Sequence, residues 1–248
     1  MAPFDTTKIT PPGGPVSLRA KGVPAYMYEV YEWAYLNPRN VKLLDREIIV
    51  SLILWGNGQR LKQALLTEIT PQATVLQAAH VYGTLIPEIA SKLSPPGQLD
   101  VVEVSPVQAG RCREKLRGFP QAVVRICDVA TLRIQPRDVV SCFFLLHEIP
   151  GDYKRAVINT LLDHVASGGK AVFVDYHKPV RLHPLRGVMN LVWRKLEPFT
   201  VELLETEIET LADDSPDFTW SKETFFGGLY QKVVATRRKP GLQPGDLQ

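Results

Sequence analysis

The chain has 248 residues, of which 45% are hydrophobic and 22% are charged, and its formal net charge at pH 7 is +3. This composition is that of an ordinary globular protein, long enough for one domain or for one domain with a cap. The basic and acidic residues are interspersed, which argues against a nucleic-acid partner.

Composition shifts along the chain predict four segments. Residues 1–23 are rich in Pro, Gly and Thr and are predicted to be disordered, as is the tail of residues 239–248. Residues 24–70 are predicted to form a helical cap, and residues 71–238 a nucleotide-binding domain of alternating strands and helices.

The predicted cap begins with aromatic residues at helical spacing, among them Tyr28, Tyr31 and Trp33. A break at Asn37-Pro38 separates this helix from a second one over residues 40–56. That second helix contains the apolar run "IIVSLILW", which is much shorter than the ~18 residues of a membrane span. We therefore predict that the run is a buried helix face.

From Thr74 onward, apolar and β-branched runs alternate with helical periodicity. The predicted strands are "TVLQAAH", "LDVVEV", "AVVRI", "VVSCFFLL" and "KAVFVDY". The helix before the fifth strand, residues 151–165, is predicted to end at Ser167–Gly169. Two last strands, within residues 217–226 and 229–237, are joined by glycines 227 and 228.

This order predicts an α/β protein with a class I methyltransferase (Rossmann-like) fold. Its sheet is expected to be mostly parallel with a C-terminal antiparallel hairpin, behind the helical N-terminal cap. The three cysteines form no CxxC pair, which argues against a disulfide framework or a zinc site. It also favours a reduced, cytoplasmic compartment.

Polar residues at the strand ends predict the ligand. The stretch "AHVYG" after the first strand has one glycine, Gly83, where a pyrophosphate-binding loop has three. Glu103 ends the second strand and can accept ribose hydroxyls, and Asp128 follows the third and can accept from an adenine amino group. Adenosine without a pyrophosphate indicates S-adenosylmethionine. The other predicted contacts to it are His80, Tyr82, Phe143 and Phe144.

A second group of candidates follows strands four and five. His147 and Glu148 end the fourth strand, and Asp175, Tyr176 and His177 end the fifth. A His–Glu pair there can serve as a base with its orienting group, as metal ligands, or as a structural cap.

Further residues are open to two interpretations. Tyr28, Tyr31 and Trp33 can form an aromatic lid over the sulfonium cation or simply pack the cap onto the domain. His183 and Arg186 are candidates for the border of the substrate pocket.

Seven segments together resemble the rhodoquinone-biosynthesis methyltransferase-like proteins (RquA), over residues 23–237. They are "ILWGN", "VYG", "LDVVEVSPVQ", "FFLLHE", "VDYHKPVRLHPLR", "LEPF" and "FFGGLYQKVV". The resemblance implies a methyltransferase fold that uses S-adenosylmethionine, with manganese, to place an amine on ubiquinone. It also implies membrane contact through residues 48–55.

The chain departs from that family at the glycine loop. Thr84 follows "VYG" where an aspartate is usual, His80 stands where a cysteine is usual, and the first helix reads "YEWAYLNP". These departures favour a sister branch that is similar to the azetidine-2-carboxylate synthases of secondary metabolism.

Four functions therefore compete. The first is cyclisation of S-adenosylmethionine alone, without a metal, to azetidine-2-carboxylate and 5′-methylthioadenosine. In it Tyr28, Tyr31 and Trp33 exclude water, and Tyr176, Asp175 or His147 orients the amine or accepts its proton. The second is amination of ubiquinone. Methyl transfer to a small molecule is the third, and a non-catalytic binding protein is the fourth.

Overall fold

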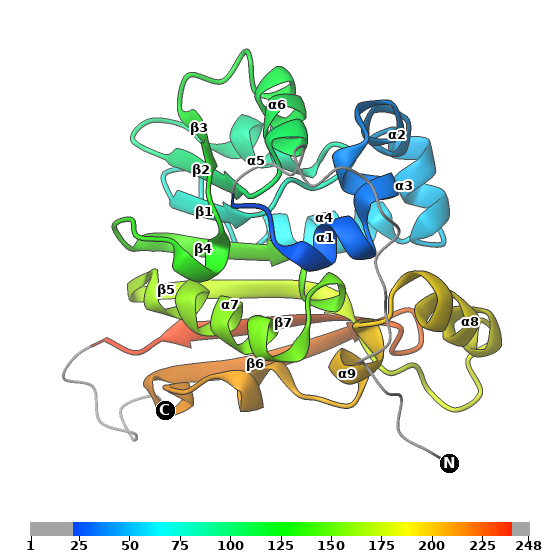
Figure 1. The fold of residues 1–248 in the computed structure, drawn as a ribbon. Helices are drawn as coiled ribbons and strands as arrows, with labels where there is room; N and C mark the ends of the chain where they lie inside the picture. The colour runs from blue at the N-terminus through cyan, green and yellow to red at the C-terminus, as the bar shows by residue number, and fades with distance from the viewer. Residues whose placement is uncertain (1–21, 240–248) are drawn as a thin grey trace.

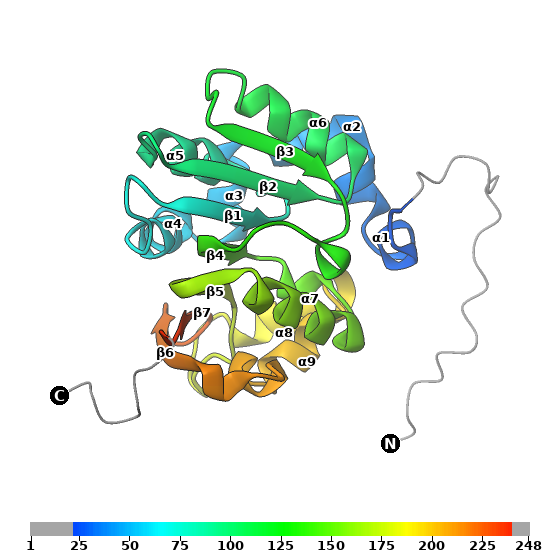
Figure 2. The ribbon, with the colours of Figure 1, turned by 90° about the vertical axis from the view of Figure 1, so that its left-hand side faces the viewer.

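The computed structural model describes residues 22–239 (Figure 1). The two predicted disordered segments fall almost entirely on residues 1–21 and 240–248, which lie outside the described residues. A sheet of seven strands, in the order β3-β2-β1-β4-β5-β7-β6, organises the chain, and Figure 2 shows this order as a ladder.

The strands follow the predicted pattern. The first five run parallel to one another, and β7 pairs antiparallel with both β5 and β6. Their bounds are β1 Thr74–Ala78, β2 Gln98–Glu103, β3 Ala122–Ile126, β4 Arg137–Phe143, β5 Val165–Tyr176, β6 Phe218–Phe225 and β7 Tyr230–Arg237. The predicted α/β class, with its mostly parallel sheet and its C-terminal hairpin, is confirmed.

Helices bury both faces of the sheet, which explains why the central strands are apolar on both sides. One core lies between the sheet and α4, α5, α6 and α8, and the other between the sheet and α7 and α9. The bounds are α4 Gly58–Leu66, α5 Leu85–Lys92, α6 Pro106–Lys115, α7 Gly151–Asp163, α8 Arg186–Leu196 and α9 Thr200–Leu204. Short 3₁₀ turns cover η4 Val129–Thr131, η5 Leu146–Glu148, η6 Ile208–Leu211 and η7 Ser215–Asp217.

The N-terminal helices are more broken than predicted. The first predicted helix divides into α1, Ala25–Glu29, and a π-helical segment η3, Glu32–Leu36. The second divides into α2, Pro38–Leu44, and α3, Glu47–Ile53. The predicted break at residue 37 is also the start of α2. The Asn37 side chain caps this helix by accepting hydrogen bonds from two of its backbone N–H groups, and Pro38 occupies the first helical position.

The predicted burial of the apolar run, residues 48–55, holds only for Leu54, which is buried just after α3, and is wrong for α3 itself. No residue of α3 is buried, and Ile48 and Leu52 are each 68% exposed. Only Val50, on the inner side of the helix, packs against the core. Helical periodicity defines an apolar stripe, but it does not say toward which side the stripe points.

The predicted role of Ser167–Gly169 is also wrong. Helix α7 ends at Asp163, and these residues lie inside β5. The register of β5 against β4 shifts there, from Arg137 opposite Val165 to Val139 opposite Lys170. Gly168 has a φ of +73°. The glycines therefore accommodate a bulge in a strand rather than a helix end.

No helix within residues 22–239 is long and apolar enough to cross a membrane.

Candidate active site

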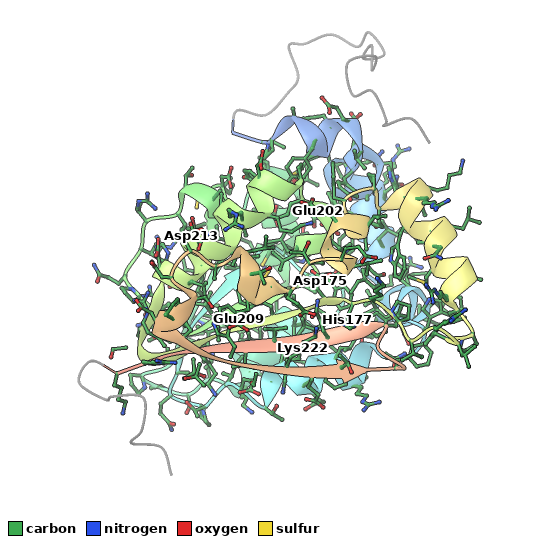
Figure 3. All side chains as sticks on the ribbon, turned by 90° about the horizontal axis from the view of Figure 1, so that it is seen from below. Asp175, His177, Glu202, Glu209, Asp213 and Lys222 are labelled. Atoms are coloured by element: carbon green, nitrogen blue, oxygen red, sulfur yellow. The ribbon has the colours of Figure 1, made fainter. Side chains whose placement is uncertain are left out.

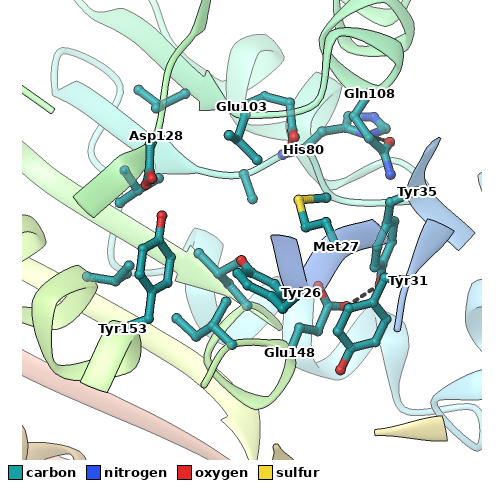
Figure 4. Close-up of a pocket in the computed structure, with 17 residues that line it drawn as sticks. Tyr26, Met27, Tyr31, Tyr35, His80, Glu103, Gln108, Asp128, Glu148 and Tyr153 are labelled. Atoms are coloured by element: carbon teal, nitrogen blue, oxygen red, sulfur yellow. Dashed lines mark hydrogen bonds between the residues drawn. The ribbon is translucent and has the colours of Figure 1, made fainter. Parts of the chain in front are cut away.

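Two adjoining cavities lie beyond the carboxyl ends of β1, β2, β4 and β5, under the N-terminal helices. The first has a volume of about 60 Å³ and is shown in Figure 4. The second has a volume of about 170 Å³. The residues that line both cavities are Tyr31, Tyr35, Ala79, His80 and Glu148.

Glu103 lies in the wall of the first cavity. Its two carboxylate oxygens accept the backbone N–H groups of His80 and Ser105, each at 2.7 Å. The side chain is deeply buried, and this burial raises its pKa to about 7. Each oxygen keeps a lone pair after these bonds, so the group can still accept from a ligand hydroxyl.

Asp128 stands opposite, at the start of η4. Its carboxylate accepts the N–H of Ala130 at 2.9 Å and so caps that turn. Figure 4 shows that Asp128 and the hydroxyl of Tyr153 point toward one another. The rings of Tyr153 and Tyr26 are 5.8 Å apart, so two aromatic groups and a carboxylate surround this end of the cavity.

The glycine-poor loop after β1 holds His80 between two polar partners. His80 Nδ1 lies 2.7 Å from Gln108 Oε1, and its Nε2 lies 3.1 Å from Lys115 Nζ. Burial, assisted by the positive charge of Lys115, lowers the pKa of His80 to about 4. His80 is therefore neutral, donating from Nδ1 and accepting at Nε2. Gln108 in turn donates to the hydroxyl of Tyr82 at 2.9 Å.

Asp45, at the C-cap of α2, ties the cap to this loop. Its buried carboxylate forms ion pairs with Arg111 Nε at 2.6 Å and Lys115 Nζ at 2.5 Å. It also accepts the N–H of Gly83 at 2.9 Å. Gly83 has a φ of +80°, a backbone conformation that favours glycine. The glycine of the loop thus serves the cap attachment, and it lies outside the walls of both cavities.

His147 lines the second cavity and is surrounded by acidic groups. Its Nδ1 lies 2.8 Å from Asp175 Oδ1, and its ring centroid lies 4.8 Å from that of Tyr176. Its Nε2 lies 3.7 Å from Glu148 Oε1 and 4.0 Å from Glu197 Oε2. We call His147, Glu148 and Glu197 the acid–base cluster.

Asp175 supports this cluster from behind. Its carboxylate accepts the backbone N–H groups of Leu146 at 2.8 Å and of Tyr176 at 2.7 Å, as well as bonding to His147. It is buried and lines neither cavity. Its contacts hold the turn after β4 against the end of β5 and orient the imidazole ring.

Burial and charge together shift the pKa values of the cluster. Burial by itself lowers the pKa of His147, but the attraction of Asp175, Glu197 and Glu148 outweighs it and raises the value to about 9. Burial raises the pKa values of Glu148 and Glu197. Acids and bases that exchange protons near neutral pH are what proton-transfer chemistry needs.

Two tyrosines of the cap complete the cluster. The Tyr31 hydroxyl donates to Glu197 Oε2 at 2.9 Å, and the Tyr35 hydroxyl donates to Glu148 Oε1. Their rings are 5.7 Å apart and form part of the wall between the two cavities. The cap therefore contacts the same two carboxyl groups that surround His147.

The predicted site residues fall into two groups. The structure brings most of them to the two cavities: Tyr31, His80, Glu103 and Asp128 in the first, and Tyr31, Trp33, His80, Tyr82, Phe143, Phe144, His147 and Tyr176 in the second. The other three, Tyr28, Gly83 and Asp175, are not among the residues that line either cavity.

The candidates beyond strand five lie outside both cavities. His177 Nδ1 bonds to the carbonyl of Gly228 at 2.9 Å, and His177 and Arg186 line a separate surface hollow. Figure 3 shows His177 near Asp175 at the end of β5. His183 packs edge-on against Phe226.

Several lining residues escaped the sequence analysis as ligand contacts, namely Tyr26, Met27, Gln108, Tyr153 and Glu197. Tyr31 and Glu197 are 166 residues apart in the chain, so no local pattern joins them. The sequence does contain one indication of Glu197, which belongs to the "LEPF" segment that carries part of the resemblance.

The manganese implied by the resemblance does not fit the donor groups. Within residues 22–239, no group of three or more His, Cys, Asp or Glu side chains is placed to hold a metal ion. We derive no chemical step through a metal.

No protein-family model matches the chain, and neither does any curated protein sequence. Solved structures do match. The mitomycin 7-O-methyltransferase MmcR superposes with a TM-score of 0.62 at 16% identity, over 81% of this chain and 58% of its own. An O-methyltransferase family protein from Burkholderia thailandensis matches with a TM-score of 0.59 at 16% identity, over 75% of this chain and 57% of its own.

A shorter neighbour is matched along nearly its whole length. The SAM-dependent methyltransferase from Aquifex aeolicus superposes with a TM-score of 0.56 at 17% identity, over 81% of this chain and 98% of its own. The present chain spans less than two thirds of the Burkholderia protein and of MmcR. At these identities the likeness establishes the fold, and the predicted class I methyltransferase fold is confirmed.

Proposed function

We propose that this protein is an enzyme that consumes S-adenosylmethionine and cyclises it to azetidine-2-carboxylate and 5′-methylthioadenosine. The observation that carries the proposal is the acid–base cluster: two mostly buried carboxyls with raised pKa values face His147 in a cavity that adjoins Glu103 and Asp128. The structures of methyltransferases with the same fold support the choice of ligand.

The first cavity suits the adenosine part of this substrate. Glu103 can accept the two ribose hydroxyls, because its oxygens retain free lone pairs. Asp128 can accept from the adenine amino group, with the rings of Tyr26 and Tyr153 close by. The cavity then directs the aminocarboxypropyl chain toward the acid–base cluster.

The cyclisation needs a base more than any other group. The α-ammonium of the substrate must lose a proton, after which the nitrogen forms a bond to the γ-carbon. The bond from that carbon to sulfur breaks, and sulfur keeps the electron pair as the neutral thioether of 5′-methylthioadenosine. Glu148 lines both cavities and is the group we assign to receive the proton.

The neighbours of Glu148 stabilise its charged form and fix the position of the groups around it. His147, kept protonated beside Asp175, can stabilise the carboxylate of Glu148 once it has lost its proton. Asp175 is a positioning residue, because it orients His147 without reaching the cavity. Glu197 also lies near Nε2 of His147, so its protonation is linked to that of His147 and Glu148.

Aromatic walls supply the second requirement, which is a folded substrate shielded from water. Tyr31, Tyr35, Phe144 and Tyr176 line the second cavity. A sulfonium against such rings is stabilised by about 0.5–2 kcal/mol. Holding nitrogen and carbon at about 3–3.5 Å in line can supply most of the rate enhancement of an intramolecular reaction.

The test is mass spectrometry of the purified protein with S-adenosylmethionine and no other reagent. Azetidine-2-carboxylate and 5′-methylthioadenosine in equal amounts are the expected result. If 5′-methylthioadenosine forms only after ubiquinone and manganese are added, quinone amination is correct and cyclisation is not. If the substrate is bound tightly and survives in every mixture, the protein is a binding protein.

Methyl transfer to a small molecule is the second candidate, and the likeness to O-methyltransferases favours it. The same acid–base cluster could take the proton from an acceptor hydroxyl during attack on the methyl carbon. This function predicts S-adenosylhomocysteine as the product, and only when an acceptor is present. The mass spectrum therefore separates the two candidates by product as well as by requirement.

A further inference from the structure

The acid–base cluster contains a buried charged donor that the fold does not satisfy. The side chain of His147 is 6% exposed, and Asp175 holds its Nδ1 at 2.8 Å. Because its pKa is about 9, both ring nitrogens carry a proton at neutral pH. Within residues 22–239 its Nε2 makes no hydrogen bond, since the carboxylate oxygens of Glu148 and Glu197 lie 3.7 and 4.0 Å away. A buried charged N–H without an acceptor is costly, so Nε2 indicates an acceptor on a ligand.

Glu148 and Glu197 each use one carboxylate oxygen within the fold. Glu148 Oε1 accepts from Tyr35, and Glu197 Oε2 accepts from Tyr31. Figure 4 shows Glu148 beside these two tyrosines. The other oxygens, Glu148 Oε2 and Glu197 Oε1, have no hydrogen-bond or ion-pair partner among the described residues. Neither is among the enclosed polar atoms that lack a partner, so each is accessible to a ligand.

His147 is the one cationic side chain that the described residues place in the walls of the two cavities. None of the residues that line them is Lys or Arg. His80 lines both cavities, but its pKa of about 4 makes it neutral. A ligand carboxylate at this site therefore has His147 as its charged partner, whereas a ligand ammonium has the free carboxylate oxygens.

We propose that the acid–base cluster recognises an α-amino-acid head group, in which His147 Nε2 donates to the carboxylate and Glu197 Oε1 accepts from the ammonium. The proposal rests on the proposed function, because S-adenosylmethionine supplies this head group. It adds recognition of both charged groups to the proton transfer assigned to Glu148. Hydrogen bonds between charged partners are the stronger kind, so they select ligands that carry both groups.

Holding the cap does not by itself explain these atoms. The hydroxyls of Tyr31 and Tyr35 need one acceptor oxygen each, and a neutral amide would provide it. They need neither a charged imidazole nor a second, accessible oxygen. His147 Nε2 and Glu197 Oε2 lie 4.0 Å apart, and the ammonium and carboxylate of an α-amino acid share one carbon, so one head group can reach both residues.

The test is isothermal titration calorimetry at neutral pH with adenosine thioethers. The ligands are S-adenosylhomocysteine, its analogue with hydrogen in place of the α-amino group, its analogue with hydrogen in place of the carboxyl group, and 5′-methylthioadenosine, which has neither group. None of them carries a sulfonium, so no reaction accompanies binding. We expect removal of either charged group to weaken binding by about tenfold or more.

Variants assign each loss to its residue. Glu197→Gln keeps an acceptor for Tyr31 but removes the charge, so it should weaken binding of S-adenosylhomocysteine about tenfold and leave the deaminated analogue unchanged. His147→Gln should likewise weaken S-adenosylhomocysteine and leave the decarboxylated analogue unchanged. Unchanged binding of 5′-methylthioadenosine shows that each variant is folded. Glu205→Gln alters an exposed carboxyl outside both cavities and, as the matched control, should change no affinity.

The proposal is overturned if the wild type binds either analogue as tightly as S-adenosylhomocysteine. It is also overturned if Glu197→Gln weakens all ligands equally, because that result identifies a structural role. If none of the thioethers binds, the proposed ligand and the head-group site fail together. If the affinities follow the expected order but no azetidine-2-carboxylate forms, the head-group site stands and the cyclisation fails.

Discussion

Two histidines at the same edge of the sheet have pKa values that move in opposite directions. Burial and Lys115 lower the pKa of His80 to about 4, whereas Asp175 and the carboxyls of the cluster bring that of His147 to about 9. The residue type is the same, and the neighbours decide its charge. His80 is accordingly suited to hydrogen bonding and His147 to electrostatic stabilisation.

The buried carboxyl of Glu103 makes the stability of the protein depend on pH. Its pKa is raised from 4.5 to about 7, so the folded state keeps a proton that the unfolded chain has already lost. As pH rises from about 4.5 to about 7, the free energy of unfolding of the wild type should therefore fall by on the order of 3 kcal/mol relative to that of Glu103→Gln, which has no proton to lose at this position. Urea unfolding of both proteins across that range measures the difference.

The same variant should also bind S-adenosylhomocysteine at least about tenfold more weakly, because an amide replaces one acceptor oxygen by a donor. Isothermal titration calorimetry gives this affinity. An unchanged affinity would remove Glu103 from the ligand site while leaving the pH effect intact.

Glu148 is the proposed general base, so its replacement should affect the chemical step. Glu148→Gln should lower kcat for 5′-methylthioadenosine formation by about 10²–10⁴, the usual contribution of a general base, with little change in affinity for the substrate. In the wild type, kcat should rise with pH as Glu148 loses its proton, because burial raises its pKa and only the anion accepts. The variant should lack this rise.

Glu197→Gln is the matched comparison, since both carboxyls flank the same nitrogen. We expect a smaller loss there, together with a shifted pH profile. If the two variants exchange these effects, Glu197 is the base and our assignment within the cluster is wrong.

At the scale of elements, the π-helical segment η3 decides what the cap presents to the site. It places Tyr35 beside Glu148 and Tyr82, while Tyr31, just before it, reaches Glu197. π-Helical turns are often found at functional sites, because the extra residue changes which side chains share a face. Of the lid predicted from the sequence, Tyr31 and Trp33 line the cavities and Tyr28 does not, while Tyr26 and Tyr35 are further aromatic residues of their walls.

Two tyrosines that precede this segment, Tyr31 and Tyr28, give a matched pair of variants. Tyr31→Phe removes the hydrogen bond to Glu197 and should lower kcat about tenfold, in keeping with a bond to a charged group. Tyr28→Phe should change kcat less than about twofold, since Tyr28 lies outside both cavities. Steady-state production of 5′-methylthioadenosine measures both. Equal losses would mean that the lid extends to Tyr28.

At the scale of the whole molecule, the cap and the sheet domain are joined by a buried charge. Asp45 at the end of α2 pairs with Arg111 and Lys115 of α6 and accepts from the loop after β1. Lys115 also contacts His80, so the attachment of the cap and the order of the ligand loop depend on one group.

We therefore expect Asp45→Asn to cost about 3–5 kcal/mol of unfolding free energy, because it leaves the mostly buried Lys115 without its ion-pair partner and Arg111 with only the exposed Glu114. Asp213→Asn is the control, since its pair with Arg155 is exposed and should be worth less than about 1 kcal/mol. Asp213 lies far from Asp175 in Figure 3. Equilibrium unfolding in urea compares the two, and similar losses would contradict the central role of Asp45.

Ligand binding should also stabilise the whole chain. S-adenosylhomocysteine at 100 times its Kd should add about 2.7 kcal/mol, which raises the Tm of a chain of this size by about 5–10 °C. Differential scanning fluorimetry measures the shift, with Glu103→Gln at the same concentration as the control. No shift in the wild type would exclude the adenosine site.

Local patterns in the sequence are enough to predict the sheet, its parallel strands and its C-terminal hairpin. Those features depend on short runs of apolar residues and on turns, and both are local properties of the chain. The same locality placed Glu103, Asp128 and His147 at strand ends, and parallel strands bring such ends to one edge of the sheet.

The contacts of these residues, in contrast, depend on how distant segments pack together. The pairs Tyr31–Glu197 and Asp45–Lys115 join segments 166 and 70 residues apart. The outward face of α3 is set by packing, since periodicity defines a stripe but not its direction. Burial likewise depends on every neighbouring element, so the raised pKa values of Glu103 and Glu148 follow from the fold rather than from their place in the sequence.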